Sequence, residues 1–174
     1  MAVERTAIDQ DTKLFKPLGD DLYIKICEWQ GEPRVDIRAW LTKCGKTSPS
    51  KTRGLSMTVA TYRQLENIVP TISKELTELI YREAGYTKFV YHINADIKVS
   101  LEWPYIGVSI RKWFKTAEGK VCPGKGIFIK PHIWHAFCQL HPQINECITQ
   151  ESTPGDLTID TERKCELHSE LQNV

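Results

Sequence analysis

Apolar and polar residues alternate in two stretches of the chain, and residues with helical spacing follow each stretch. Every second residue from Leu22 to Ile26 is apolar, and Val35 and Ile37 repeat the pattern after a turn at residues 30–33. Alternation of this kind is typical of strands that bury one face. We therefore predict a hairpin at this point of the chain.

A helix is predicted after this hairpin. A basic loop and a short strand at residues 55–57 come first, and an apolar stripe then covers residues 59–69 at helical spacing. Pro70 is expected to stop or kink the helix, because proline has no amide hydrogen for the helical bond. The amphipathic residues 71–87 are predicted to form a helical connector.

The second half of the chain repeats the first. Read without gaps, residues 24–40 lie 73 residues before residues 97–113; after one dropped residue the offset is 72, up to a second helix that opens at Pro131. A fixed period of this size indicates two copies of one supersecondary unit. A unit this small buries only about 60% of its unfolded surface alone, so we expect the copies to pack on each other.

These patterns divide the chain into segments that also differ in charge. The middle of the chain, residues 22–130, carries 18 Lys and Arg against 10 Asp and Glu, whereas both ends are net acidic. The predicted segments are a flexible arm (residues 1–13), a first unit (14–70), the connector (71–87), a second unit (88–148) and a mostly disordered acidic tail (149–174).

Several classes of function find no support in the sequence. No apolar stretch approaches the ~20 residues that span a bilayer, no signal peptide is visible, and the six cysteines form no CxxC pair. We therefore predict an intracellular protein. No Ser-His-Asp or paired-carboxylate constellation is present either, so no enzyme activity is expected.

One row of possible metal ligands lies in the second predicted helix. His132, His135, Cys138 and His141 recur every three residues, which could suggest a zinc site. Steps of three drift around a helix, however, and the first unit has no comparable pattern. We expect neither a metal nor a cofactor.

Short motifs recur in the two units. The second unit has IRKWF at residues 110–114, PGKGI at residues 123–127 and Trp134, and the first has IRAW at residues 37–40 and RGL at residues 53–55. Together they resemble the C-terminal single-stranded-DNA-binding domain of the positive cofactor four family of transcriptional coactivators.

The resemblance covers about residues 14–69 and 88–142, and the second unit is the closer match. It implies four antiparallel strands followed by a helix, used in that family as a homodimer. We therefore expect an α+β fold of two tandem units, each a curved four-stranded antiparallel sheet followed by a helix. The units would pack as an intramolecular pseudo-dimer, and the chain would be a monomer.

The implied function is binding of single-stranded or melted DNA, as a transcriptional coactivator or regulator that acts with the transcription machinery in the nucleus. Single strands are held by a positive groove and by aromatic rings on which bases stack. Residues 34–53 and 111–130 each hold six basic residues against one acidic residue. The expected nucleic-acid-binding residues are Lys25, Trp29, Arg38, Trp40, Lys51 and Arg53 in the first unit, and Lys98, Arg111, Trp113, Phe114, Lys120 and Lys125 in the second.

Several alternatives stay open. Trp40 and Trp113 either stack on bases or pack inside the protein. Single-stranded RNA would fit the same groove, because stacking and phosphate contacts do not read the sugar. The chain could also be a protein-interaction adaptor that kept the fold and lost the groove, and a role in replication fits the residues as well as one in transcription.

Overall fold

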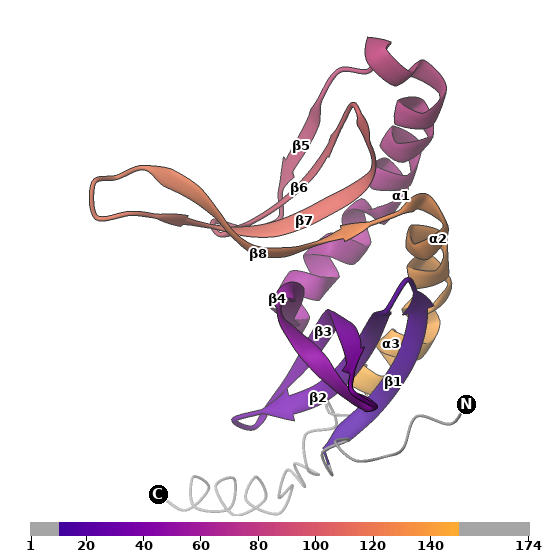
Figure 1. Ribbon diagram of the computed structural model, residues 1–174, viewed down its shortest axis with the longest axis vertical. Helices are drawn as coiled ribbons and strands as arrows, with labels where there is room; N and C mark the ends of the chain where they lie inside the picture. The colour runs from indigo at the N-terminus through magenta and orange to yellow at the C-terminus, as the bar shows by residue number, and fades with distance from the viewer. Residues whose placement is uncertain (1–10, 150–174) are drawn as a thin grey trace, which may run out of the picture.

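The computed structural model describes residues 11–149, which form one eight-stranded, mostly antiparallel sheet with helices packed on it (Figure 1). The strand order is β1-β2-β3-β4-β8-β7-β6-β5. The elements are β1 (Thr12–Gly19), β2 (Leu22–Trp29), β3 (Glu32–Lys43), β4 (Lys46–Thr58), α1 (Val59–Arg82), the 3₁₀ turn η1 (Glu83–Gly85), β5 (Phe89–His92), β6 (Ile97–Glu102), β7 (Tyr105–Lys115), β8 (Val121–Ile129), α2 (Pro131–Gln139) and α3 (His141–Thr149). The predicted α+β class is confirmed.

The ends of the chain differ in part from the predicted segments. Most of the predicted arm and acidic tail lies outside the described residues. Residues 12 and 13, which were assigned to the arm, begin β1, and Thr149 ends α3. The sequence analysis did not predict β1, because polar and charged residues interrupt its apolar alternation.

The element order repeats once along the chain. Four strands and α1 form what we call the first unit, and β5–β8 with α2 and α3 form the second. Val35 pairs with Met57 at the centre of the first unit, and Val108 pairs with Ile129 in the second. These four side chains are buried, because the alternation in each strand turns them toward the helices.

The gap-free alignment of the two units is wrong in their second strands. Ile24 pairs with Ile37 in the first unit, whereas Val99 pairs with Ile110 in the second, so Ile24 corresponds to Val99 and not to Ile97. Twelve residues separate Ile24 from Ile37 and ten separate Val99 from Ile110, so the second hairpin is two residues shorter. A shift of two residues preserves the in-out alternation, so the hydrophobic pattern does not reveal it.

The predicted basic loop of the first unit is a continuation of the sheet. β4 begins at Lys46 and stays paired with β3 through Ser48 and Pro49, so the two strands form one long hairpin. Glycine, serine and proline in this segment indicated a loop. Proline is tolerated here because the far end of the hairpin has no further strand beside it.

α1 is longer than predicted. It runs without interruption from Val59 to Arg82 and contains Pro70, at which we had expected the first helix to stop or kink. Pro70 is exposed, so its ring and the carbonyl it leaves unbonded lie on the solvent side of the helix. Leu65 and Ile72 on the opposite side are fully buried, and this packing outweighs the local cost of proline.

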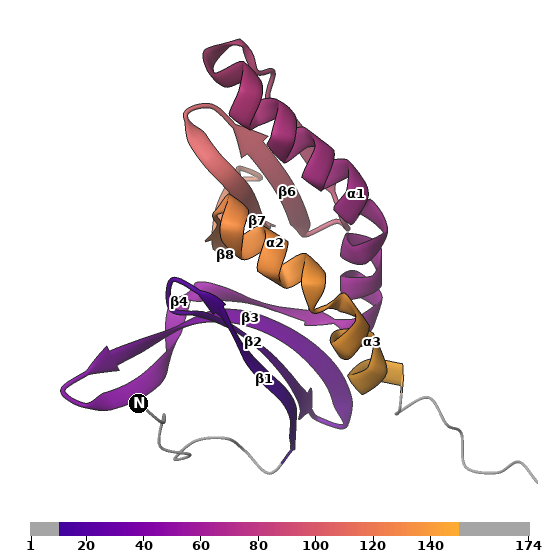
Figure 2. The same cartoon turned by 90° about the vertical axis from the view of Figure 1, so that its right-hand side faces the viewer.

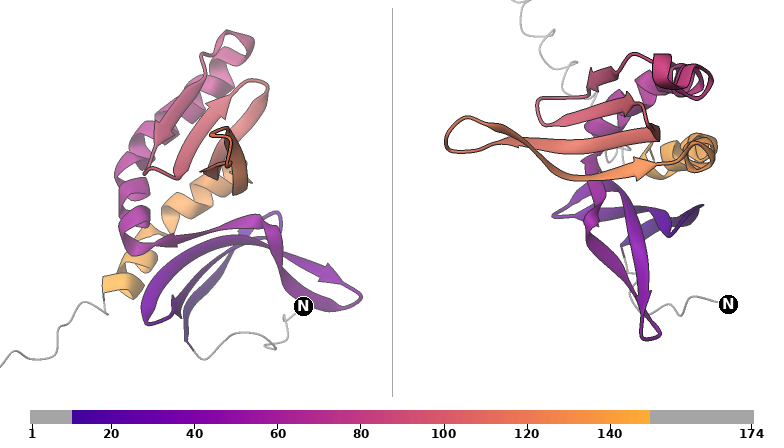
Figure 3. Two further views of the ribbon diagram at one scale, coloured as in Figure 1. Left: turned by 90° about the vertical axis from the view of Figure 1, so that its left-hand side faces the viewer. Right: turned by 45° about the horizontal axis from the view of Figure 1, so that its top comes forward.

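The helices connect the two units. α1 contacts β3 and β4 of the first unit and β6 and β7 of the second, while α3 returns to contact β1 and β2. α2 lies between the strands of the two units (Figures 2 and 3). Trp134 in α2 donates a hydrogen bond to Ser73 Oγ in α1 at 3.0 Å, and Tyr62 in α1 bonds His141 in α3. The buried residues of both units therefore form one core.

Candidate nucleic-acid interface

Two long hairpins extend beyond the packed core, one from each unit. β3 and β4 remain paired out to Lys43 opposite Lys46, and β7 and β8 out to Lys115 opposite Val121. The right-hand view in Figure 3 shows the two hairpins projecting in different directions. A register shift, after Arg38 in β3 and after Arg111 in β7, marks where each hairpin bends away.

The predicted contact residue Arg38 is bound within the protein. Its Nε and Nη2 donate to the Asp36 carboxylate at 3.0 and 2.9 Å, and its Nη1 donates to the Ser50 carbonyl at 2.6 Å. The hydrogen bonds that Arg38 donates to Asp36 raise the pKa of the guanidinium, which is charged at every ordinary pH. Arg38 therefore fixes the bend of the first hairpin.

Arg111 has the corresponding position in the second unit. Its Nη1 donates to the Gly124 carbonyl at 2.8 Å, across the same kind of bend. Gly126 lies close beside it: a Cβ there would be 2.6 Å from the Ile110 carbonyl oxygen and 2.8 Å from the Arg111 Cα. Unlike Arg38, Arg111 has no carboxylate partner in the described part of the chain, so its charge is less neutralised.

The two tryptophans that follow these arginines have different surroundings. Trp40 packs its edge against Phe15, with ring centroids 5.0 Å apart, and also contacts Tyr23. Trp113 instead lies under the ammonium group of Lys98, which is 4.6 Å from the ring centroid. Both rings are half-buried on the face of the sheet away from the helices. Trp40 belongs to a closed aromatic cluster, whereas Trp113 carries a cation on its face.

The remaining predicted aromatic residues are open to solvent. Phe114 is 53% exposed at the start of the free part of the second hairpin, and Trp29 is 66% exposed at the β2–β3 turn. Lys25 is half-buried and lies opposite Asp36 in the sheet register. Phe114, which follows Trp113 in the chain, is therefore exposed enough to stack on a base.

The other predicted basic residues are exposed. Lys120 lies near the turn of the second hairpin, and Lys125 lies near its base. Lys51 and Arg53 are in β4, whose Arg53 pairs with Gly126 of β8 in a parallel contact between the units. Lys125 and Arg53 therefore lie near the place where the two units meet.

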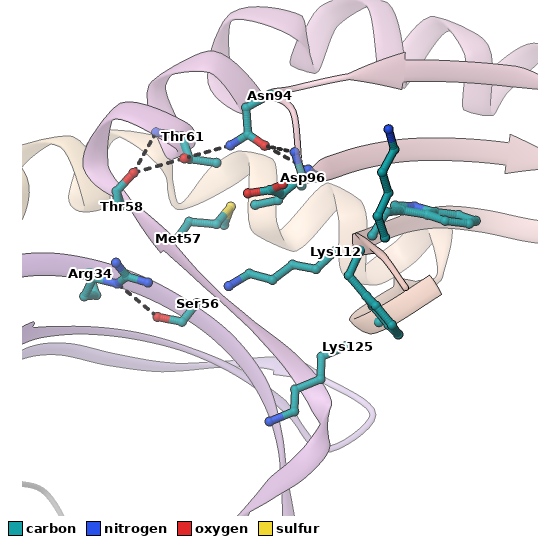
Figure 4. Close-up of a pocket in the computed structure, with 14 residues that line it drawn as sticks. Arg34, Ser56, Met57, Thr58, Thr61, Asn94, Asp96, Lys112 and Lys125 are labelled. Carbon is teal, nitrogen blue, oxygen red and sulfur yellow. Dashed lines mark hydrogen bonds between the residues drawn. The ribbon is translucent and has the colours of Figure 1, made fainter. Parts of the chain in front are cut away.

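A groove of about 690 Å³ opens at this junction, and we call it the seam groove (Figure 4). The first unit lines one wall with Arg34, Ser56, Met57, Thr58 and Thr61. The second unit lines the other with Asn94, Asp96, Ile97, Lys112, Trp113, Phe114, Lys115, Gly124 and Lys125. It brings together the predicted residues Trp113, Phe114 and Lys125. The other nine predicted residues are not among its lining residues.

The seam groove is strongly positive. Arg34, Lys112, Lys115 and Lys125 line it, and Asp96 is the one carboxylate among the lining residues. Figure 4 shows the Lys112 side chain reaching from the second unit toward Ser56 and Arg34 of the first. Cations that converge from two sides raise the local concentration of anions.

Hydrogen bonds hold the polar wall of the groove in place. Arg34 Nε donates to Ser56 Oγ at 3.3 Å, and Asn94 Nδ2 donates to Thr61 Oγ1 at 3.3 Å. Thr58 caps α1 by accepting a hydrogen bond from the Thr61 amide at 3.2 Å. The first unit and the turn before β6 are thus joined by side chains that face the groove.

Sequence reasoning missed most of this groove. Arg34, Lys112 and Lys115 were counted among the basic residues of the hairpins but were not selected as site residues. Ser56 and Asn94 carried no signal, because the groove exists only after the two units have packed. The internal repeat was the available indication, since it implies a junction between the copies.

The described residues contain neither a metal-binding cluster nor a helix suited to cross a membrane. Among residues 11–149, no group of three or more His, Cys, Asp or Glu side chains could hold a metal ion. Of the row considered for zinc, His132 approaches Asp20 at 3.7 Å and His141 bonds Tyr62. None of the helices in this part of the chain has the length and apolar character to cross a membrane.

Comparison with known families identified one match. Residues 16–68, under a third of the chain, match the model of the family described as Transcriptional Coactivator p15 (PC4). The match falls on the first unit, although the sequence analysis had taken the second as the closer one. Comparisons with curated proteins and with solved structures gave no match. At the level of the family, the match indicates single-stranded-DNA binding and transcriptional coactivation, and the family is not one of enzymes.

Proposed function

We propose that the protein binds single-stranded or melted DNA as a transcriptional coactivator or regulator. One observation carries this proposal: Trp113 and Phe114 line the same groove as four cations and a single carboxylate. The family match to residues 16–68 supports DNA as the nucleic acid and transcription as the process. A nuclear location and contact with the transcription machinery are part of the same proposal.

The chemistry of the groove suits a single strand better than a duplex. Bases that stack on an aromatic ring must be unpaired, and each stacked base contributes roughly 1–3 kcal/mol. Phe114 is exposed enough to accept a base, while Lys112 and Lys125 are exposed and free to approach phosphates. Lys98 on the ring of Trp113 adds a further cation at the edge of this surface.

We further propose that the two units form an intramolecular pseudo-dimer and that the chain is a monomer. The repeated element order, the exchange of helix contacts and the Tyr62–His141 bond between α1 and α3 support this arrangement. The helix faces that a homodimer would bury between two chains are covered here within one chain. Light scattering should give a mass near 20.0 kDa, and a mass of twice that value would contradict the proposal.

A fluorescence anisotropy titration tests the function. The probes are a labelled thymidine oligonucleotide, its uridine counterpart and a duplex, each at two salt concentrations. We expect the thymidine strand to bind most tightly, with log affinity falling by about 0.7 per contacted phosphate for each unit of log salt. About four contacts would give a slope of roughly −3.

Each outcome of this titration selects one function. Tighter binding of the uridine strand would replace DNA by RNA as the ligand. Absence of salt-dependent binding to any of the three would leave the protein-interaction adaptor, in which the fold is kept without a nucleic-acid groove. A preference for the duplex would contradict the stacking role of Phe114.

A further inference from the structure

We propose that the chain binds one strand and not two, because the counterpart of the seam groove lacks the hydrogen-bonding pairs and two of the cations of the seam groove. The inference rests on the proposed function and makes it more specific. A symmetric pair of units would present two equivalent grooves, one on each side of the contact between β4 and β8. The residues at corresponding positions decide whether both are open.

The pairing registers identify these positions. Asp36 pairs with Ser56, and Ser109 pairs with Phe128, so Phe128 is the counterpart of Ser56. By the same register Gly107 is the counterpart of Arg34. These assignments depend on backbone pairing and not on similarity of the side chains.

The turns and helices extend the correspondence. Thr61 and Ile133 are each the third residue after the cap of their helix, since Thr58 caps α1 and Lys130 caps α2. Asn94 corresponds to Gly19, because both lie three residues before the paired strands β6 and β2 begin. The polar wall of the seam groove can therefore be compared with its counterpart residue by residue.

The counterpart has lost its hydrogen-bonding pairs. Where Arg34 donates to Ser56, the second unit has Gly107 beneath the ring of Phe128, and a Cβ on Gly107 would be 2.5 Å from that ring. Where Asn94 donates to Thr61, the counterpart has Gly19 and Ile133, whose Cγ1 lies 3.4 Å from a Cβ built on Gly19. Two polar pairs are replaced by two apolar contacts.

The backbone also prevents the second unit from restoring the arginine. A Cβ at Gly107 would also be 2.7 Å from the Ile129 carbonyl oxygen, so no side chain fits there without moving the strand. Removing the Phe128 ring alone would therefore not allow an arginine at position 107. The second unit cannot regain the Arg34 position by a single substitution.

The seam groove and its counterpart also differ in their basic residues. Lys112, exposed in the seam groove, corresponds to Ala39, which is completely buried. Near the counterpart, Lys130 forms an ion pair with Asp20 at 2.7 Å, and Arg53, which corresponds to Lys125, is exposed. The hydrogen bond from Lys130 lowers the pKa of the Asp20 carboxyl, so the pair stays charged and closed on itself at neutral pH. A phosphodiester would find Arg34 and Lys112 on opposite walls of the seam groove, whereas their counterparts Gly107 and Ala39 carry no charge.

These differences indicate which groove holds the ligand and how many strands one chain binds. The seam groove holds a phosphodiester of one single strand between Arg34 and Lys112, with a neighbouring base against Phe114. Charge-assisted bonds of this kind are the strong ones in phosphate recognition. The second side of the sheet contributes no equivalent strand site, so one chain binds one strand.

Native mass spectrometry with a thymidine oligonucleotide of about ten nucleotides tests the number of strands, since small single-strand-binding folds have sites of this size. We expect one strand per chain even with excess oligonucleotide. Two strands per chain would overturn the inference while leaving the proposed function intact. Absence of any complex would instead overturn the proposed function itself.

Matched substitutions test the location. Arg34→Gln and Lys112→Gln should each weaken binding about tenfold, as loss of one charge-assisted bond predicts. Phe128→Ser, which changes the counterpart of Ser56, should alter binding less than twofold. Lys112 is exposed, so Lys112→Gln keeps the test valid if Arg34→Gln fails to fold. An equal loss in Phe128→Ser, or no loss in Lys112→Gln, would contradict the inference.

Discussion

The two units of this protein have the same pattern of buried residues in their strands, and they differ on the opposite face of the sheet. In the first unit Phe15 stacks on Tyr23 with ring centroids 4.9 Å apart, and Trp40 closes the cluster. In the second unit Lys98 takes the place of Tyr23, and its ammonium lies over Trp113. An apolar cluster in one copy is therefore a cation and an accessible ring in the other.

The match to the family and the more exposed polar surface therefore lie in different units. The family model matches the first unit, whose arginine at the bend is fully paired and whose tryptophan is packed. The second unit has no such match but supplies Lys112, Phe114 and Lys125 to the seam groove. The unit that matches the family model is therefore not the unit that supplies most of the residues of the seam groove.

The largest expected effect is a loss of stability in the core that the two units share. Phe137→Ala should lower the free energy of unfolding by about 3–5 kcal/mol, because the ring is fully buried and contacts the rings of Trp134 and His141. Urea denaturation followed by circular dichroism and tryptophan fluorescence measures the loss. Phe114→Ala, at an exposed phenylalanine of the same unit, should change stability by no more than ~0.5 kcal/mol. Two separate transitions would mean that the units fold independently.

The next effect separates the two tryptophans. Trp113→Ala should cost about 1–3 kcal/mol of single-strand binding if a base stacks at this surface. Trp40→Ala should change binding less than threefold and should instead lower the melting temperature, because ring pairs such as Trp40 with Phe15 contribute roughly 0.5–1.5 kcal/mol each. Anisotropy and thermal unfolding of both variants give the comparison. Equal binding losses would show that both faces contact the strand.

Salt dependence should distinguish the lysines of the two hairpins. Lys112→Gln combined with Lys125→Gln should make the slope of log affinity against log salt less steep by about 1.4, the value for two phosphate contacts. Lys43→Gln with Lys46→Gln, at the end of the first hairpin, should leave the slope nearly unchanged. If both pairs reduce it equally, the strand follows both hairpins, and the single-groove model is wrong.

The smallest expected effect is a pH dependence of stability. Burial lowers the pKa of His141 from its ordinary value of 6.5, with partial opposition from Glu66. The unfolded chain therefore binds this proton more readily, and the free energy of unfolding should fall as the pH drops below about 6.5. The carboxyls of Asp20 and Glu66 have lowered pKa values, so they do not titrate between pH 6.5 and about 5.

Thermal unfolding at several pH values measures this effect. His141→Gln should remove the dependence in that window, because glutamine cannot be protonated and still can bond Tyr62. His135→Gln, at an exposed histidine on α2, is the control and should leave it unchanged. A dependence that survives in His141→Gln would assign the titration to another group.

The sequence predicted the repeated strands and helices because their buried faces follow simple periods. The sequence did not predict the lengths of elements that are extended by pairing or by contact with the other unit. Pro70 indicated a helix end, but packing on both units continues α1 past it. The serines and the proline of β4 indicated a loop, although backbone pairing with β3 continues through Ser48 and Pro49.

The predicted binding residues show the same limit of what a residue pattern can indicate. Arg38 and Arg111 alternate with buried residues of β3 and β7, but this pattern could not show that Asp36, Ser50 and Gly124 occupy their hydrogen bonds. Contacts of this kind depend on the bend in each hairpin, which no period reveals. The contribution of each predicted residue to binding stays a prediction.

The exchange of helices has a consequence for synthesis on the ribosome. β1 and β2 are made first, yet the helix that covers them, α3, is the last of the described elements to be made. The part of the apolar face that β1 and β2 form therefore lacks α3 until almost all of the described chain has emerged, although α1 can cover β3 and β4 earlier. Long-range contacts of this kind delay folding and expose apolar surface meanwhile. The nascent chain should thus need protection by chaperones longer than a chain in which each unit is covered by its own helix.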